Sequence, residues 1–185
     1  MSENSDKYKR AVSGMDAVVD KIGTDGWAAA SPCEGWSAKH VIGHVITGFH
    51  MISFGATGQA PNFEDPLAAA GDDPAGAYAA ARDTTLSALT DEYLTSTVPG
   101  PMGDMQVDQM LGMFMIGDSL IHTWDLARSA GMDVALDPQL AEEVYNNLQP
   151  VDAMIRSNNI FGPKIEPPAD ADIQTKLLCF VGRQP

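Results

Sequence analysis

The chain has 185 residues, of which 25 are acidic and 11 are basic, and its formal net charge is −14. A surface this negative repels phosphate backbones and anionic membranes, so we expect neither nucleic acid nor a membrane as a partner, whereas metal cations are attracted. Hydrophobic residues make up 44 % of the chain, which is typical of a folded protein and argues against a disordered one. We expect residues 1–185 to form a single domain.

The two cysteines, Cys33 and Cys179, stand far apart in the sequence and form no CxxC motif. No signal peptide is recognisable, so we expect both to be reduced thiols and the protein to be cytoplasmic. No apolar run approaches the roughly 18 residues that a membrane helix needs. The sequence leaves the oligomeric state open, a homodimer included.

Apolar residues recur at intervals of three and four along most of the chain, which predicts helices. Ser37, Asp73 and Asp137 are predicted N-caps, and the last two precede a proline at the first helical position. Gly55 and Gly131 are predicted to end helices. The expected helices cover residues 5–22, 37–54, 74–93, 108–130, 138–155 and 171–181.

Residues 95–107 interrupt this pattern. Two short β-prone stretches, at 95–98 and 105–107, flank a turn-forming segment at 99–103 that is rich in proline and glycine, and this arrangement predicts a hairpin or an extended loop. The predicted fold class is therefore all-α, a helical bundle with one small β-like insertion.

Two polar residues, Asp118 and His122, lie on the apolar stripe of the helix predicted over 108–130. A carboxylate and an imidazole on a buried face are costly unless something compensates them. Side chains four residues apart on a helix lie one above the other and can share a cation. His44, from the helix predicted over 37–54, would complete a set of two histidines and one carboxylate, which is typical of metal sites that leave room for an exogenous ligand.

Other interpretations of these residues stay open. Asp118 and His122 could form a buried hydrogen-bonded pair, or their helix could be rotated so that both face solvent. His44 could be a core histidine or share a metal with His40, four residues before it. Asp125 could replace Asp118 as the inward carboxylate or accept a hydrogen bond from a metal-binding histidine. His50 falls off the stripe and is expected to be exposed.

A few other side chains suggest a role. Cys33 precedes a predicted helix start, where a thiol can be reactive, although a small buried residue is the commoner role. Met102 and Met105 could line an adaptable apolar pocket. The tryptophans are expected to anchor the core, and Cys179 is expected to be buried in a short helix.

Four stretches of the sequence resemble a known family: residues 32–36 leading to His44, residues 118–127 with the block His122-Thr123-Trp124-Asp125-Leu126-Ala127, Gly131 with the helix start at 136–137, and residues 161–163 with 177–183. They are similar to the actinobacterial metal-binding branch of the DinB/YfiT-like superfamily, which is related to the N-terminal domain of mycothiol-dependent maleylpyruvate isomerase. The resemblance implies an up-down-down-up four-helix bundle with extra short C-terminal helices, and a metal held by His44, Asp118 and His122.

The resemblance also implies a function. We expect a divalent metal, zinc or else nickel or iron, and a low-molecular-weight thiol such as mycothiol that reacts with a small electrophilic molecule. The expected activity is metal-dependent thiol transfer or isomerisation, with the loops at 55–73 and 95–107 covering the substrate. The alternatives are a non-catalytic bundle that binds a metal or small ligand, and a bundle recruited to a cyclisation or isomerisation step with a vestigial metal site.

Overall fold

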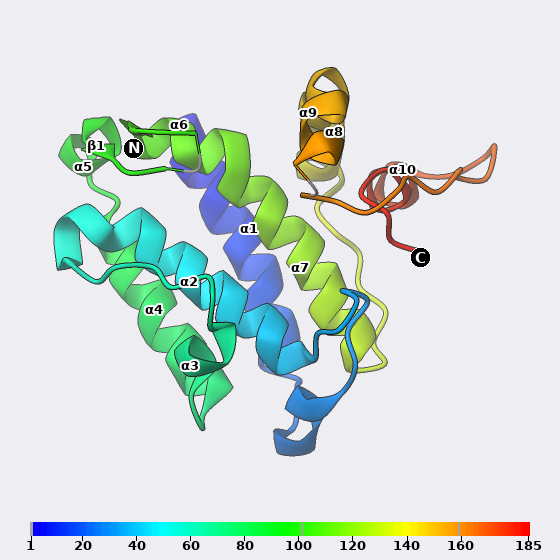
Figure 1. Cartoon of the computed structure of the whole chain (residues 1–185), viewed down its shortest axis with the longest axis horizontal. Coiled ribbons are helices and arrows are strands. Elements are labelled where there is room, and N and C mark those ends of the chain that lie inside the picture. The colour runs from blue at the N-terminus through cyan, green and yellow to red at the C-terminus, as the bar shows by residue number, and fades with distance from the viewer. Residues whose placement is uncertain (1, 101, 159) are drawn as a thin grey trace.

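The computed structural model describes residues 2–100, 102–158 and 160–185. Pro101, within the predicted turn at 99–103, lies outside the described residues. The bundle consists of α1 (Glu3–Val19), α2 (Ala38–Thr57), α4 (Pro74–Ala88) and α7 (Ile116–Ser129). In Figure 1, α1 and α7 run in one direction and α2 and α4 in the other, which is the up-down-down-up order that the family resemblance implies.

Shorter elements connect and extend the bundle. They are α3 (Pro66–Ala70), α5 (Asp91–Thr95), β1 (Thr97–Val98), β2 (Met105–Gln106), α6 (Val107–Met110), α8 (Pro138–Leu148), α9 (Asp152–Ser157) and α10 (Ile173–Phe180), with 3₁₀ turns at Thr24–Ala28 and Gln149–Val151 and a π-helical segment at Leu111–Met115. β1 and β2 pair antiparallel, with Thr97 opposite Gln106. The prediction of an all-α bundle with a small hairpin and short C-terminal helices is confirmed.

The predicted N-caps form as expected. The side chains of Asp73 and Asp137 accept hydrogen bonds from backbone N–H groups in the first turns of α4 and α8, whose first residues are Pro74 and Pro138. These bonds satisfy donors that have no partner within the helix. Asp73 and Asp137 therefore determine where two of the helices begin.

The prediction that Gly55 ends the second helix is wrong, because α2 continues to Thr57 and is capped by Gly58 with φ +73°. A Cβ at Gly55 would lie 3.2 Å from the side chains of Tyr93 and Val98. Gly55 thus allows the hairpin region to approach α2 closely, and the residue in the left-handed conformation comes three positions later.

Two other helices are interrupted. The predicted helix over 74–93 is split, because α4 ends at Ala88 and Thr90 caps the separate helix α5. The helix predicted over 108–130 is α6, then a π-helical segment, then α7. A π turn inserts an extra residue into the helical repeat and is common near functional sites; here it ends just before Asp118.

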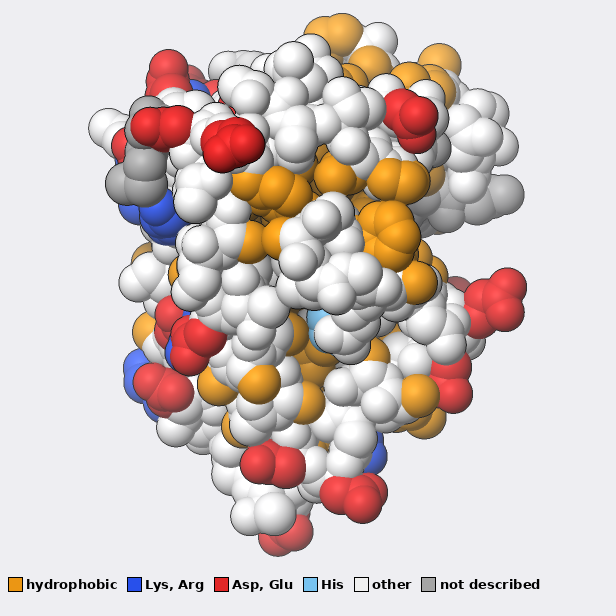
Figure 2. Space-filling view, turned by 90° about the vertical axis from the view of Figure 1, so that its left-hand side faces the viewer, with side chains coloured by type: hydrophobic (Ala, Val, Ile, Leu, Met, Phe, Trp, Pro, Cys, Tyr) orange, Lys and Arg blue, Asp and Glu red, His pale blue; other side chains and the backbone are white. Residues whose placement is uncertain are grey.

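One hydrophobic core fills the space between the bundle helices. Its largest fully buried side chains are Tyr8, Tyr78, Phe49, Met15, Ile42, Ile46, Ile52, Met110, Leu111, Ile121, Leu126 and Leu140. On the face in Figure 2, acidic side chains lie in several places around the outer parts of the view and fewer basic ones are visible, consistent with the charge of the chain. Among the described residues, no helix combines the length and apolar character needed to cross a bilayer.

Candidate metal centre

His44 faces Asp118 and His122 across the contact between α2 and α7. Nε2 of His44 lies 3.2 Å from Oδ1 of Asp118, and Nε2 of His122 lies 3.5 Å from the same oxygen. One ligand atom from each of the three side chains falls within 4.8 Å of the other two. The structure therefore brings together the three residues that the sequence singled out; that they bind a metal stays a prediction.

The spacing of these atoms fits a metal ion. Around a tetrahedral zinc with bonds of about 2.0–2.1 Å, neighbouring ligand atoms are about 3.3 Å apart. The carboxylate oxygen of Asp118 is 3.2 and 3.5 Å from the two imidazole nitrogens. An ion could thus be held by His44, Asp118 and His122 without a large movement of either helix.

The candidate centre is open to solvent on one side. The side chains of His44 and Asp118 are 26 % and 25 % exposed, and that of His122 is 11 % exposed. Two aromatic residues border it: the rings of Trp36 and Phe63 each have their centroid 5.5 Å from that of His44. A small molecule could reach the three ligand atoms along this side and contact aromatic rings there.

Asp125 fixes the orientation of the His122 ring. Oδ2 of the fully buried Asp125 lies 2.9 Å from Nδ1 of His122. An ionised carboxylate can only accept, so Nδ1 carries the hydrogen and Nε2 points toward Asp118. This arrangement matches the second of the roles that the sequence left open for Asp125, a hydrogen-bond acceptor behind a metal ligand.

Arg183 completes this buried group, and the sequence reasoning missed it. Its Nε and Nη2 donate to Oδ1 and Oδ2 of Asp125 at 3.1 and 2.8 Å, and Nη2 also lies 3.2 Å from Sγ of Cys33. The thiol of Cys33 in turn donates to Oδ2 of Asp125 at 3.2 Å. No local pattern signals this contact, because 58 residues separate Arg183 from Asp125.

Cys33, His122 and Asp125 form a second group with ligand-like spacing. A cation there would meet the guanidinium of Arg183, which already contacts both Cys33 and Asp125. Like charges at such short range repel strongly. The group is therefore built around an internal cation, and the triad with Asp118 is the better candidate for a metal.

The charges of the site shift its pKa values. Burial lowers the pKa of His122, but the nearby carboxylates of Asp118 and Asp125 outweigh burial and raise it to about 10. Burial raises the pKa of Asp125, but hydrogen bonds from His122 and Arg183 outweigh this and lower it to about 2. The pKa of Asp118 is lowered as well, because His122 and His44 outweigh the effect of burial. Without a metal, His122 is thus an imidazolium between two carboxylates.

The other candidate side chains lie elsewhere or play other parts. His40 accepts a hydrogen bond from the backbone N–H of Ser37 at 3.1 Å, so it caps α2 instead of joining His44. His50, expected to be exposed, is half-buried. Cys179 is buried as expected, whereas Met102, which was predicted to line an apolar pocket, is 63 % exposed.

Two further expectations about the surroundings fail. Trp36 was expected in the core with the other tryptophans, yet it is only half-buried and stacks on His40 and His122, whereas Trp27 and Trp124 are buried. The described residues of the loop at 95–107 do not cover the site, because Val98 packs at Gly55, about three helical turns beyond His44. Of the two loops, the connection at 55–73 is the one whose described residues reach the site, through Phe63.

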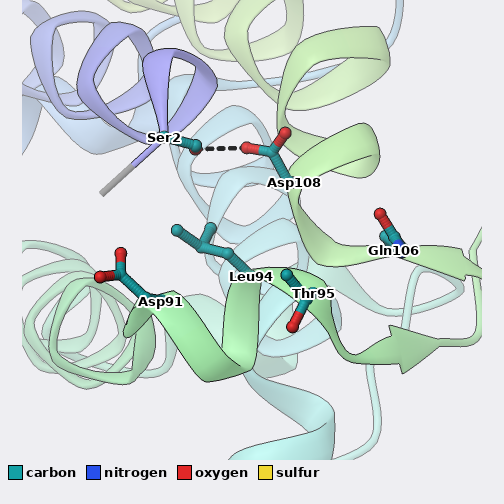
Figure 3. Close-up of a pocket in the computed structure, with 6 residues that line it drawn as sticks. All are labelled: Ser2, Asp91, Leu94, Thr95, Gln106 and Asp108. Atoms are coloured by element: carbon teal, nitrogen blue, oxygen red, sulfur yellow. Dashed lines mark hydrogen bonds between the residues drawn. The ribbon is translucent and has the colours of Figure 1, made fainter.

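A separate hollow of about 320 Å³ lies between α5 and the start of α6. Figure 3 shows its lining, with Asp91, Leu94 and Thr95 on one side and Asp108, which accepts a hydrogen bond from Ser2, on the other. Its ionisable lining residues are carboxylates, with no imidazole or thiol. The hollow thus lacks the mixed ligand set of the candidate metal centre.

Comparisons with known proteins identify the family and the fold of the chain. Two uncharacterized proteins of Mycobacterium tuberculosis, from strains CDC 1551 / Oshkosh and ATCC 25618 / H37Rv, are each 29 % identical over 136 residues, which cover 74 % of this chain and 72 % of each relative. The crystal structure of a histidine-to-alanine mutant of mycothiol-dependent maleylpyruvate isomerase shares the fold, with a TM-score of 0.58 and 13 % identity over 91 % of this chain and 77 % of that one. Residues 8–127 match the model of the mycothiol maleylpyruvate isomerase N-terminal domain. The chain therefore belongs to the mycothiol maleylpyruvate isomerase N-terminal domain family.

Proposed function

We propose that this protein is a cytoplasmic metalloenzyme that uses mycothiol or a similar small thiol, and that it either transfers the whole thiol to a small electrophilic molecule or isomerises that molecule. The observation that carries the proposal is the convergence of His44, Asp118 and His122 to within 4.8 Å on an exposed side of the bundle. Membership of a family named for a mycothiol enzyme supports the proposal that the co-substrate is a small thiol.

The ligand set suits a catalytic metal better than a structural one. Structural zinc sites have four protein ligands, whereas catalytic sites combine three protein ligands with an open position. Two imidazoles and one carboxylate suit zinc, and the same set also occurs around ferrous iron. A divalent metal bound there would supply a positive charge that keeps a coordinated thiol ionised at neutral pH.

The residues of the chain would perform the remaining tasks. Asp125 and the buried side of α7 hold His122 in place, so the ring does not turn when a ligand enters. Trp36 and Phe63 offer apolar rings beside His44, where they can contact the electrophile and exclude part of the water. The negative charge of the chain favours the metal and disfavours polyanionic partners such as nucleic acid.

Metal and thiol binding can be tested on the purified protein. Elemental analysis should find a divalent metal in the wild type and in His50→Ala, and none in His44→Ala. His50 is a suitable control because it lies on the same helix and contacts Gln59, not the triad. A wild-type protein that retains no metal, even after incubation with zinc, would overturn the metal part of the proposal.

Cobalt-substituted protein then tests the thiol. Addition of mycothiol should produce a thiolate-to-cobalt charge-transfer band, whereas S-methylated mycothiol should produce none. The spectrum before addition shows whether the protein's own Cys33 binds cobalt, in which case the band is already present. If cobalt binds and millimolar mycothiol leaves the spectrum unchanged, the bundle is a metal-binding protein without the proposed thiol chemistry.

A further inference from the structure

The C-terminal segment reaches the candidate metal centre through one side chain. α10 ends at Phe180 with Val181 as its C-cap, and Gly182 then adopts φ +83°, which turns the chain back toward the bundle. A Cβ at Gly182 would lie 2.9 Å from the carbonyl oxygen of Pro163, so glycine is needed for space as well as for conformation. The backbone N–H of Arg183 then donates to the carbonyl of Leu178 at 2.8 Å, which fixes the residue against the helix end.

From this position the guanidinium of Arg183 holds Asp125 by two parallel hydrogen bonds. They join Nε to Oδ1 at 3.1 Å and Nη2 to Oδ2 at 2.8 Å, and the Arg183 side chain is only 12 % exposed. A two-point contact of this kind fixes the plane of a carboxylate as well as its position. Asp125 is fully buried, and once His122 gives up a proton to bind a metal, Arg183 is the cation that still compensates the Asp125 carboxylate.

The oxygen of Asp125 that binds Nη2 also accepts the hydrogen bond from Nδ1 of His122. The plane of the carboxylate therefore sets the plane of the imidazole, and the imidazole carries Nε2 into the triad. The chain of contacts runs from Arg183 through Asp125 to His122, each link at 2.9 Å or less. Substitution of Arg183 should turn or release the ring without touching the triad directly.

We propose that Arg183 is a positioning residue for the metal centre, which orients the ligand His122 by clamping Asp125 and so makes the C-terminal segment part of the site. The inference rests on the metal centre of the proposed function. It adds that metal affinity depends on the docking of residues 181–183, which lie outside the stretch that matches the family model.

The test compares two arginines that both hold the C-terminal helix. Arg156 donates to the carbonyls of Gly162 and Phe180, and its guanidinium stacks 5.3 Å from the Phe180 ring, so it anchors the same region without contacting Asp125. We expect Arg183→Gln to weaken cobalt binding about 10–100-fold and to change the visible spectrum of bound cobalt. Arg156→Gln should lower the melting temperature of the metal-free protein but keep the cobalt affinity within about twofold of wild type. Arg183→Lys, which retains the charge and one donor direction, should recover part of the affinity.

A double variant keeps the test valid if Arg183→Gln does not fold, because Asp125→Asn removes the buried charge that Arg183 neutralises. If Arg183 acts through Asp125, the variant Asp125→Asn/Arg183→Gln should bind cobalt like Asp125→Asn alone. Further loss in the double variant, or wild-type affinity and spectrum in a folded Arg183→Gln, would overturn the inference. If the wild type itself binds no metal, it is the proposed function that fails.

Discussion

His122 donates through Nδ1 to Asp125 at 2.9 Å, and this bond leaves Nε2 of the same ring facing Asp118 at 3.5 Å. The two carboxylates on α7 thus have different roles, although both lie near the imidazole of His122. Asp118 shares a solvent-accessible side with His44, whereas Asp125 is fully buried behind the ring. One can act as a metal ligand, and the other can only support a ligand.

The first prediction distinguishes the role of Asp118 from that of Asp125. Asp118→Ala should abolish metal binding, because it removes one of three ligands, while Asp125→Asn should weaken binding about 10–100-fold, because the ring is held less firmly. Competition with a chromogenic chelator measures both affinities. Normal metal binding by Asp118→Ala together with loss of binding in Asp125→Asn would show that the roles are exchanged.

The second prediction concerns stability. A metal that binds only the folded state stabilises it by mass action, by about 2.7 kcal/mol when the free metal is a hundredfold above its Kd. The melting temperature of the zinc-loaded wild type should therefore fall on addition of a chelator. The Asp118→Ala protein should melt at the same temperature with and without it, and a chelator-dependent shift in that variant would point to a metal bound elsewhere.

The third prediction concerns protons. The pKa of His122, raised to about 10 in the metal-free protein, means that the ring is protonated at neutral pH and must lose its Nε2 proton to bind a metal. Metal binding at pH 7.5 should release about one proton from His122, and the apparent affinity should increase as the pH rises toward 10. Calorimetry in two buffers with different ionisation enthalpies counts the protons.

The Asp125→Asn variant provides the control for this experiment. It removes one of the two carboxylates that raise the pKa of His122, so it should release fewer protons at the same pH. The direction of this pKa shift also determines how the stability of the metal-free protein depends on pH. Because the pKa of His122 is raised in the folded state, protonation of this ring stabilises the fold at pH values below the ordinary histidine pKa. This stabilisation is lost as the pH rises through about 10. Metal binding without proton release at pH 7.5 would mean that His122 is already neutral.

The parts of the site that the sequence could predict are those set by local periodicity. Asp118 and His122 are four residues apart on a helix, so they share a face wherever that helix packs. The caps at Asp73 and Asp137 are equally local, because the bonds that they make stay within one helical turn. These features follow from positions close together in the chain and need no knowledge of the tertiary structure.

The features that were missed depend on tertiary contacts. Arg183 meets Asp125 only because α10 packs beside α8, and the half-buried Trp36 faces imidazoles because the loop before α2 folds over the site. The apolar stripe predicts a helix at Leu111–Met115 but does not distinguish a π-helical segment from an α-helix. Gly55 resembles a helix end in the sequence, although it lies inside α2 and allows Tyr93 and Val98 to pack closely there.

The last prediction uses two glycines of α2 that differ in what surrounds them. A Cβ at Gly43 would lie 1.9 Å from the carbonyl oxygen of Pro66, so alanine there must push α3 away from α2. A Cβ at Gly48 would meet only the terminal methyl of Met115, at 2.8 Å, and that flexible side chain can move aside. Gly43→Ala should therefore lower the free energy of unfolding by about 1–3 kcal/mol.

Gly48→Ala should change the same free energy by less than about 1 kcal/mol, because alanine's better helix propensity offsets the small adjustment of Met115. Urea denaturation of the metal-free proteins measures both values. The two variants should also differ at the site, since Gly43 adjoins His44 and α3 continues the loop whose Phe63 contacts His44. We therefore expect Gly43→Ala, and not Gly48→Ala, to alter the spectrum of bound cobalt. Equal stability of the two variants would mean that α3 is not packed on Gly43 as closely as the structure has it.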